Sequence, residues 1–145
     1  MTPQERAARA AQAMWAQDTA SQQMGMKIVE VAPGRAVMTM QVQPHHLNGH
    51  KICHGGFIFT LADSAFAFAC NSYNTLTVAQ ENQITFLSPG QAGETLTATC
   101  FETARQGRSG VYDVTVTGED GRKVAVMRGL SRTIKGQHFE EEPAS

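Results

Sequence analysis

The sequence has few cysteines, no long hydrophobic segment and almost no net charge, and each of these features excludes a class of protein. The three cysteines lack CxxC spacing, which favours reduced thiols in a cytoplasmic protein over a disulfide framework. The most apolar run, residues 55–70, is shorter than the ~17–25 residues of a membrane span. The N-terminus lacks the apolar region of a signal peptide. We therefore expect a soluble cytoplasmic protein that does not enter a membrane.

The composition fits one folded domain with a small anionic ligand better than a nucleic-acid-binding protein. The chain has 145 residues with 41% hydrophobic content, and its net charge of −1 attracts no polyanion. Residues 105–135 are mildly basic, with seven Lys or Arg against three Asp or Glu. We expect a single domain over residues 1–136 and an acidic, flexible tail over 137–145.

The order of predicted elements indicates an α+β fold. Residues 3–19 suit a helix with Thr2 as its cap, and residues 55–73 a long central helix that is apolar on nearly every side. Alternating segments predict strands, with a loop over 43–54. A helix this apolar must be covered, so we expect an antiparallel β-sheet wrapped around it. The predicted strands are 26–31, 35–42, 77–87, 94–103, 108–117 and 122–134.

Asp63 lies in the middle of this apolar helix and is the first candidate functional residue. Helical spacing places it on a narrow polar stripe with Thr60, Ser64, Ala67 and Asn71. No basic residue occurs between positions 51 and 105 to neutralise it nearby in sequence. We expect a carboxylate that is desolvated, or partnered at a dimer interface, with a perturbed pKa.

The start of the same helix offers a second functional group. Gly55 and Gly56 carry no side chains, and the first amides of a helix are free to bind an oxyanion. Gly55 and Asp63 are eight positions apart, which is about 12 Å along a helix. One helix therefore cannot bring both groups to one carbonyl. Two antiparallel copies can, which predicts a dimer with composite active sites.

Four histidines in the loop over 43–54 raise the question of a metal site. His50 and His54 have a spacing found in zinc sites, and Cys53 lies beside them. Glycines and a proline break any helix there, however, and no carboxylate is near in sequence. We expect no metal, and expect His54 to order the loop or line the site.

Several motifs resemble those of one enzyme family. The segments LNGHKICHGG, LADSAFAFACN, FLSPGQAGETLTA and RSGVYDVTV resemble the hotdog-fold acyl-CoA thioesterases of the phenylacetate-degradation (PaaI) type. The resemblance covers roughly residues 12–135. It implies the hotdog fold, hydrolysis of acyl-CoA, and no metal or other cofactor, with coenzyme A as part of the substrate. It also implies a homotetramer built as a dimer of dimers.

The resemblance assigns roles to individual positions. Asp63 matches the catalytic carboxylate, acting as nucleophile or as general base on water, and Gly55 matches the residue whose N–H polarises the thioester carbonyl. Asn48 and His54 match loop residues that position the thioester and the attacking group. A residue early in the next strand often orients water in this family, and the candidates here are Thr77, Gln80 and Glu81.

The predicted substrate is an aromatic acyl-CoA such as phenylacetyl-CoA or a hydroxyphenylacetyl relative. The phenylalanines around Asp63 offer an apolar slot, and we expect Phe57 and Gly56 to contact substrate. The candidates for holding the CoA phosphates are four basic residues, Arg105, Arg108, Arg128 and Arg132.

Two alternatives remain. A hotdog dehydratase or hydratase would need His54 as a proton shuttle together with an acid. A non-catalytic acyl-CoA-binding module would gain nothing from a buried carboxylate, so Asp63 argues against it.

Overall fold

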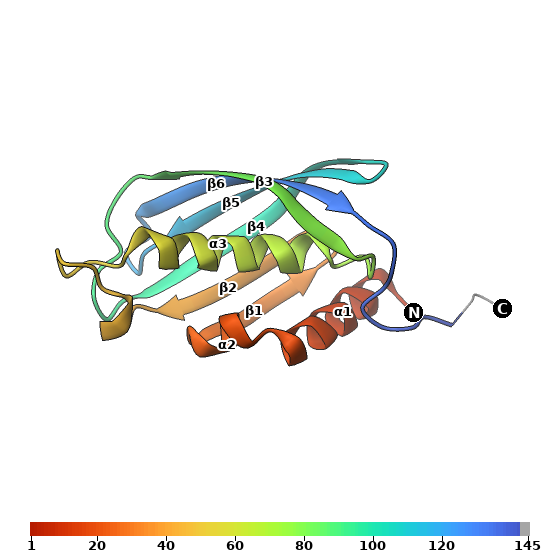
Figure 1. Cartoon of the computed structure of the whole chain (residues 1–145), viewed down its shortest axis with the longest axis horizontal. Coiled ribbons are helices and arrows are strands. Elements are labelled where there is room, and N and C mark those ends of the chain that lie inside the picture. The colour runs from red at the N-terminus through yellow and green to blue at the C-terminus, as the bar shows by residue number, and fades with distance from the viewer. Residues whose placement is uncertain (143–145) are drawn as a thin grey trace.

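The computed structural model describes residues 1–142 and consists of a curved sheet around one long helix (Figure 1). The six strands are antiparallel to their neighbours in the order β1-β2-β4-β5-β6-β3. In residues 1–142, no helix is long and apolar enough to cross a membrane. The elements are α1 (Pro3–Gln17), α2 (Thr19–Gln23), β1 (Met26–Ala32), β2 (Arg35–Gln41), a 3₁₀ turn (Pro44–His46), α3 (Gly55–Cys70), β3 (Thr77–Phe86), β4 (Thr95–Gln106), β5 (Ser109–Thr117) and β6 (Lys123–Thr133).

The core lies between α3 and the concave face of the sheet. Alternate residues of β2, β4 and β5 point inward and are buried, as the strand period of two requires. Leu61, Ala62 and Ala65 of α3 are fully buried against them. Gly129 on β6 lets the sheet approach the helix closely, because a Cβ there would lie 2.1 Å from the Phe66 ring. The predicted α+β hotdog architecture is confirmed.

The N-terminal helix is shorter than predicted. Thr2 caps α1 as expected, with Glu5 completing a capping box. The helix ends at Gln17, however, because Asp18 leaves the helical conformation and its carboxylate accepts a hydrogen bond from the Ser21 N–H at 3.0 Å. The predicted single helix over 3–19 is therefore two helices, α1 and α2.

The central helix also ends earlier than predicted, at Cys70 instead of residue 73. Asn71 closes it. Its amide donates to the carbonyl oxygens of Ala67 and Thr77 at 2.8 and 3.0 Å. Asn74 then adopts a φ of +62°, which turns the chain into β3. That strand forms one edge of the sheet, and most of its residues are exposed.

Residues 138–141 pack against the domain, within the segment 137–145 that we predicted to be a flexible tail. The backbone N–H of His138 donates to the side chain of Asn74 at 2.9 Å. Glu141 forms an ion pair with Arg6 at 2.7 Å, and Arg9 lies 4.3 Å from the centre of the Phe139 ring. Residues 143–145 of the predicted tail lie outside the described part of the chain.

Candidate active site

The N-terminus of α3 presents one free amide. His54 is its N-cap, and the His54 Nδ1 atom accepts a hydrogen bond from the Gly56 N–H at 2.9 Å. The Phe57 and Ile58 amides donate to the His54 carbonyl oxygen at 3.0 and 3.4 Å. Of the first four backbone amides of α3, only the Gly55 N–H has no acceptor within residues 1–142. The N–H of Gly56, a residue predicted to contact substrate, already donates to His54.

Gly55 borders a cavity of about 390 Å³ whose lining is mainly apolar. The Phe86 ring covers Gly55 so closely that an added Cβ would lie 3.1 Å from it. Phe86 is itself 50% exposed and so can contact a ligand. The cavity is lined by Asn48, Ile52, Cys53, Gly55, Ile58, Phe86, Leu87, Ser88 and Pro89. Asn48 and Gly55, two of the predicted catalytic residues, thus share one cavity.

Asn48 shapes the loop in front of this cavity. Its Oδ1 accepts hydrogen bonds from the N–H groups of His50 and Ile52 at 2.9 and 3.4 Å. Its backbone carbonyl accepts the Lys51 N–H at 3.0 Å, and Lys51 has a φ of +63°. The side-chain Nδ2 has no acceptor within the described residues, so it remains available to a ligand.

Among the loop histidines, the structure singles out His46, which the sequence did not. It is fully buried, its Nδ1 accepts the Gln43 N–H at 3.0 Å, and its ring lies 4.8 Å from the ring of Phe57. Burial, helped by the neighbouring His45, lowers the pKa of His46, so the ring is neutral at pH 7. His46 is a structural support for the loop. Within residues 1–142, no group of three or more potential metal ligands is brought together.

Asp63 lies in the middle of α3 and accepts a hydrogen bond from a residue of strand β3. The Nδ2 of Asn82 on β3 donates to its Oδ1 at 2.9 Å. Burial raises the pKa of Asp63, and the Asn82 hydrogen bond opposes this rise. The expected perturbation of this carboxylate therefore follows from its surroundings.

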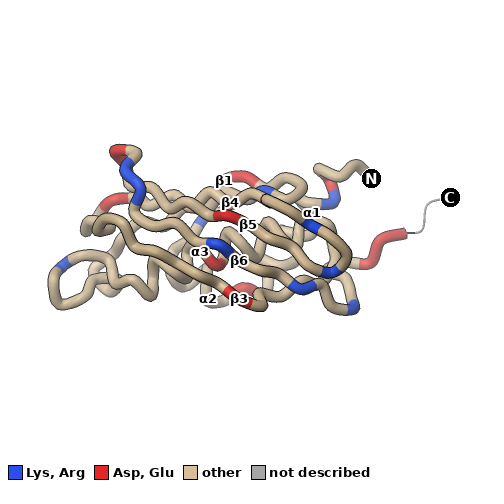
Figure 2. Tube along the Cα trace, turned by 90° about the horizontal axis from the view of Figure 1, so that it is seen from above, with Lys and Arg blue, Asp and Glu red and all other residues tan. Residues whose placement is uncertain are grey.

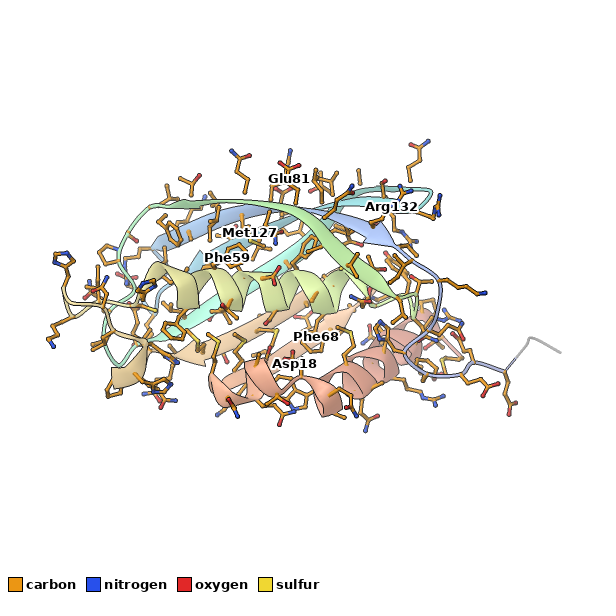
Figure 3. The ribbon with its side chains drawn as sticks, viewed as in Figure 1. Asp18, Phe59, Phe68, Glu81, Met127 and Arg132 are labelled. Atoms are coloured by element: carbon orange, nitrogen blue, oxygen red, sulfur yellow. The ribbon has the colours of Figure 1, made fainter. Side chains whose placement is uncertain are left out.

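The strand residue beside Asp63 is Asn82, and none of the three predicted candidates takes this place. Thr77 bonds to Asn71 and Thr133 at the far end of α3, while Gln80 and Glu81 are exposed on the edge strand. Figure 3 shows Glu81 pointing away from the helix. Sequence reasoning missed Asn82 because the bulge at Gln80 changes which residues of β3 face inward.

The polar stripe predicted on α3 is divided between two surfaces. Ser64 is buried and its hydroxyl lies 2.8 Å from that of Ser21 on α2, so it belongs to the interior. Asn71 is also buried. Thr60, Asp63 and Ala67 are only partly buried and lie on one face of the helix. This face, which we call the open face of α3, carries Asp63 toward the surface.

The single chain therefore contains two separate half-sites. Neither Asp63 nor His54 lines the cavity at Gly55. Gly55 and Asp63 are eight positions apart in one continuous helix, which separates them by about 12 Å along the axis.

The predicted basic residues lie elsewhere. Arg105, Arg108 and Arg132 are at the β4–β5 hairpin end of the sheet, where Figure 2 shows basic residues near the chain termini. Arg105 packs on the Tyr73 ring at 3.4 Å. Arg128 makes two hydrogen bonds to Asp113, each 3.0 Å, on the outer face of the sheet. None of the four lines the Gly55 cavity in the described part of the chain.

The predicted apolar slot is only partly correct. Phe66 and Phe68 are 1% exposed and belong to the core, and neither lines the Gly55 cavity. Phe57 packs against the rings of His46 and His54. The phenylalanine that does line the cavity, Phe86, was not predicted, because it comes from the end of β3, far from α3 in sequence.

Comparison with known proteins identifies the family of this chain. A family model described as thioesterase superfamily matches residues 50–125. Acyl-coenzyme A thioesterase PaaI of Escherichia coli is 45% identical over 126 residues, 87% of this chain and 90% of the relative. The solved E. coli PaaI structure, from the phenylacetic acid degradation operon, superposes with a TM-score of 0.92 at 42% identity, covering 94% and 99% of the two chains. A hypothetical thioesterase from Streptococcus pneumoniae, solved with coenzyme A, has a TM-score of 0.74 at 25% identity, covering 77% and 88%.

Proposed function

This chain belongs to the thioesterase superfamily as a hotdog-fold acyl-CoA thioesterase, and we propose that it hydrolyses arylacetyl-CoA esters at sites shared by two subunits. The observation that carries the composite site is the free Gly55 amide, which lies in a cavity that the same chain's Asp63 does not line. Asp63 is half-buried on the open face of α3 instead. A second α3, antiparallel to the first, brings the Asp63 of one subunit to the Gly55 of the other. The small residue Ala67 on this face permits a close approach.

In the proposed mechanism the Gly55 N–H binds the thioester carbonyl oxygen and stabilises the negative charge that develops on it. Acting as a base, Asp63 takes a proton from water while the water oxygen bonds to the carbonyl carbon. The C–S bond then breaks, the CoA thiolate leaves, and the proton held by Asp63 passes to it. Acting as a nucleophile, Asp63 would displace CoA directly and form an anhydride, which water then opens. A thioester is reactive enough for either route without a serine–histidine pair.

The loop residues take supporting roles. Asn48 offers its free Nδ2 to the substrate from the same cavity as Gly55. His54 has an indirect role: its Nδ1 accepts a hydrogen bond from the Gly56 N–H, which leaves the Gly55 N–H as the oxyanion donor. The dehydratase alternative needs a histidine that moves a proton together with an acid, and the Nδ1 atom of His54 is already engaged by the Gly56 N–H.

The acyl group of the substrate is proposed from the cavity wall. A carbonyl bound at Gly55 places its acyl group against the ring of Phe86, with Leu87 and Pro89 beside it. A volume of about 390 Å³ suits a small ligand, and ring-on-ring contact favours an aryl group.

The proposal extends to CoA binding and assembly. Antiparallel packing of two α3 helices brings the hairpin end of one subunit toward the Gly55 end of the other. Arg108 and Arg132 at that end are the basic residues we propose for the CoA phosphates, because Arg128 and Arg105 are already paired. We further propose a tetramer built from two such dimers, and catalysis without a metal.

A thiol-release assay with phenylacetyl-, hydroxyphenylacetyl-, benzoyl- and straight-chain CoA esters tests this function. We expect fastest release from the arylacetyl esters and no change on adding a chelator. Asp63→Asn should lower kcat by about 10²–10⁴-fold with similar KM. Binding of all esters without release of thiol would instead support the non-catalytic binding module.

A further inference from the structure

Asn82 occupies a restricted position between β3 and α3. It is paired across the sheet with Gly129, which has no side chain. The ring of Phe66 fills the space above that glycine, since an added Cβ would lie 2.1 Å from the ring. The Asn82 side chain therefore has no cross-strand partner and reaches the helix at Asp63.

The side-chain amide of Asn82 hydrogen-bonds to Asp63 through its nitrogen, while its oxygen is left without a hydrogen-bond partner in the described part of the chain. Nδ2 donates to Asp63 Oδ1 at 2.9 Å, while the Asn82 Oδ1 is buried and has no donor within residues 1–142. Turning the amide over would place this oxygen against the carboxylate, so the contact with Asp63 fixes the orientation. A buried acceptor without a partner is unfavourable for stability. An apolar side chain of similar size would leave no buried acceptor without a partner. The presence of an amide here therefore indicates that its hydrogen bond to Asp63 matters.

We propose that Asn82 is the positioning residue for Asp63 in thioester hydrolysis, holding one carboxylate oxygen so that the other faces the open face of α3. This inference rests on the proposed role of Asp63 as the reacting carboxylate. Asn82 acts in two ways. It restricts rotation of the carboxylate, and it stabilises the ionised form that both the base and the nucleophile mechanisms require.

The other titratable groups around Asp63 do not replace this effect. Cys70 on α3 and Cys100 on β4 are buried thiols, and burial raises the pKa of both, to about 12 for Cys70. Burial likewise raises the pKa of Tyr112 on β5. Glu102 on β4 accepts hydrogen bonds from Tyr73 and Tyr112. No other charged group on the neighbouring elements is hydrogen-bonded to Asp63 within residues 1–142; these groups are Glu81 on β3, Lys27 and Glu30 on β1, Arg35 on β2, Arg105 on β4, Asp113 on β5, Lys123, Arg128 and Arg132 on β6, and Asp18 before α2.

Two substitutions test the proposal through the pH dependence of kcat. Asn82→Leu removes the donor with similar volume, and Asn82→Asp keeps the shape but places a second carboxylate beside Asp63. We expect kcat at neutral pH to fall about 10–100-fold, with KM nearly unchanged. The acidic limb of the pH profile should move to higher pH in both variants, and further in Asn82→Asp because like charges oppose ionisation. Gln83→Leu, the next residue on the same strand but exposed, should change neither.

A double-variant cycle separates positioning from a general structural effect. In an Asp63→Asn background the Asn82→Leu change should leave the residual kcat unaltered, because there is no carboxylate to position. Wild-type kcat and an unshifted pH profile in both Asn82 variants would overturn the inference while leaving the thioesterase assignment intact. Equal losses of kcat with and without Asp63 would also overturn it. A wild-type protein that releases no thiol from any ester would instead refute the proposed function.

Discussion

The Nδ1 atom of His54 accepts the Gly56 N–H at 2.9 Å, and this contact decides which amide of α3 is left for a substrate. The next two amides donate to the His54 carbonyl, so the cap engages every early amide except that of Gly55. A helix N-terminus usually offers several donors. Here it offers one, placed beneath the ring of Phe86.

Gly55→Pro should remove this donor without breaking the helix. Proline is well accommodated at the first helical position, and His54 has a ψ of 135°, which suits a residue before proline. Loss of one oxyanion donor typically lowers kcat by about 10²–10³-fold. Gly55→Ala is the matched control, since it keeps the N–H and also crowds Phe86. Steady-state kinetics should show a much smaller kcat loss for alanine, and equal losses would refute the donor role.

Replacing Asp63 by asparagine should lower the activity of the enzyme but raise its thermal stability. Burial raises the pKa of Asp63 above the ordinary value of 3.8, so the ionised form is disfavoured in the folded state. A carboxyl of this kind destabilises the fold at pH values above its raised pKa, and the cost vanishes below the unfolded-state pKa. Asp63→Asn should therefore raise Tm at neutral pH while greatly lowering kcat, and the gain in Tm should disappear as the pH is lowered from the raised pKa to the unfolded-state pKa. Thermal unfolding followed across pH measures this, and a lower Tm at neutral pH would contradict it.

Wild-type activity should decline on the acidic side as Asp63 becomes protonated. Because the pKa of Asp63 is raised, the decline should begin at a higher pH than an exposed aspartate would give. The pH profile of kcat measures this limb. An activity that stays constant down to the ordinary aspartate range would show that the ionised Asp63 is not required.

Gly129 on β6 should be among the least replaceable glycines. A Cβ there would overlap the Phe66 ring at 2.1 Å, and such overpacking typically costs about 1–3 kcal/mol. We expect Gly129→Ala to lower the free energy of unfolding in denaturant titration. Gly49→Ala is the control, because an added Cβ meets nothing within 4 Å. A Gly129→Ala protein as stable as the control would contradict the packing described.

The fold was largely predictable because its signals are local. Alternation marks the strands, and an apolar helix without a polar side needs a sheet around it. The boundaries that failed depend on single side-chain contacts, such as the Asp18 carboxylate that separates α1 from α2. The packed segment at 138–141 was missed because its composition is polar, while its contacts with Asn74 and Arg6 join residues distant in sequence.

The site was predictable where its residues share one element. Gly55 and Asp63 follow from helical geometry, and Asn48 from its motif. Asn82 and Phe86 reach the site from β3. A bulge at Gln80 decides which residues of this strand face the helix, and the alternation of apolar and polar residues in the sequence does not reveal it. The stripe on α3 was predicted as one surface, but Ser64 turns to Ser21 because α2 packs there.

The central claim, that Gly55 and Asp63 act together from different subunits, is tested most directly by mixing two inactive variants. Asp63→Asn and Gly55→Pro subunits are unfolded together and refolded in equal amounts, and kcat per site is measured against each variant alone. Mixed dimers would contain one intact site and one doubly altered site. Random assembly should restore about a quarter of wild-type activity. No recovery, with mixed dimers demonstrated by differential tags, would show that each chain holds a complete site and would contradict the account.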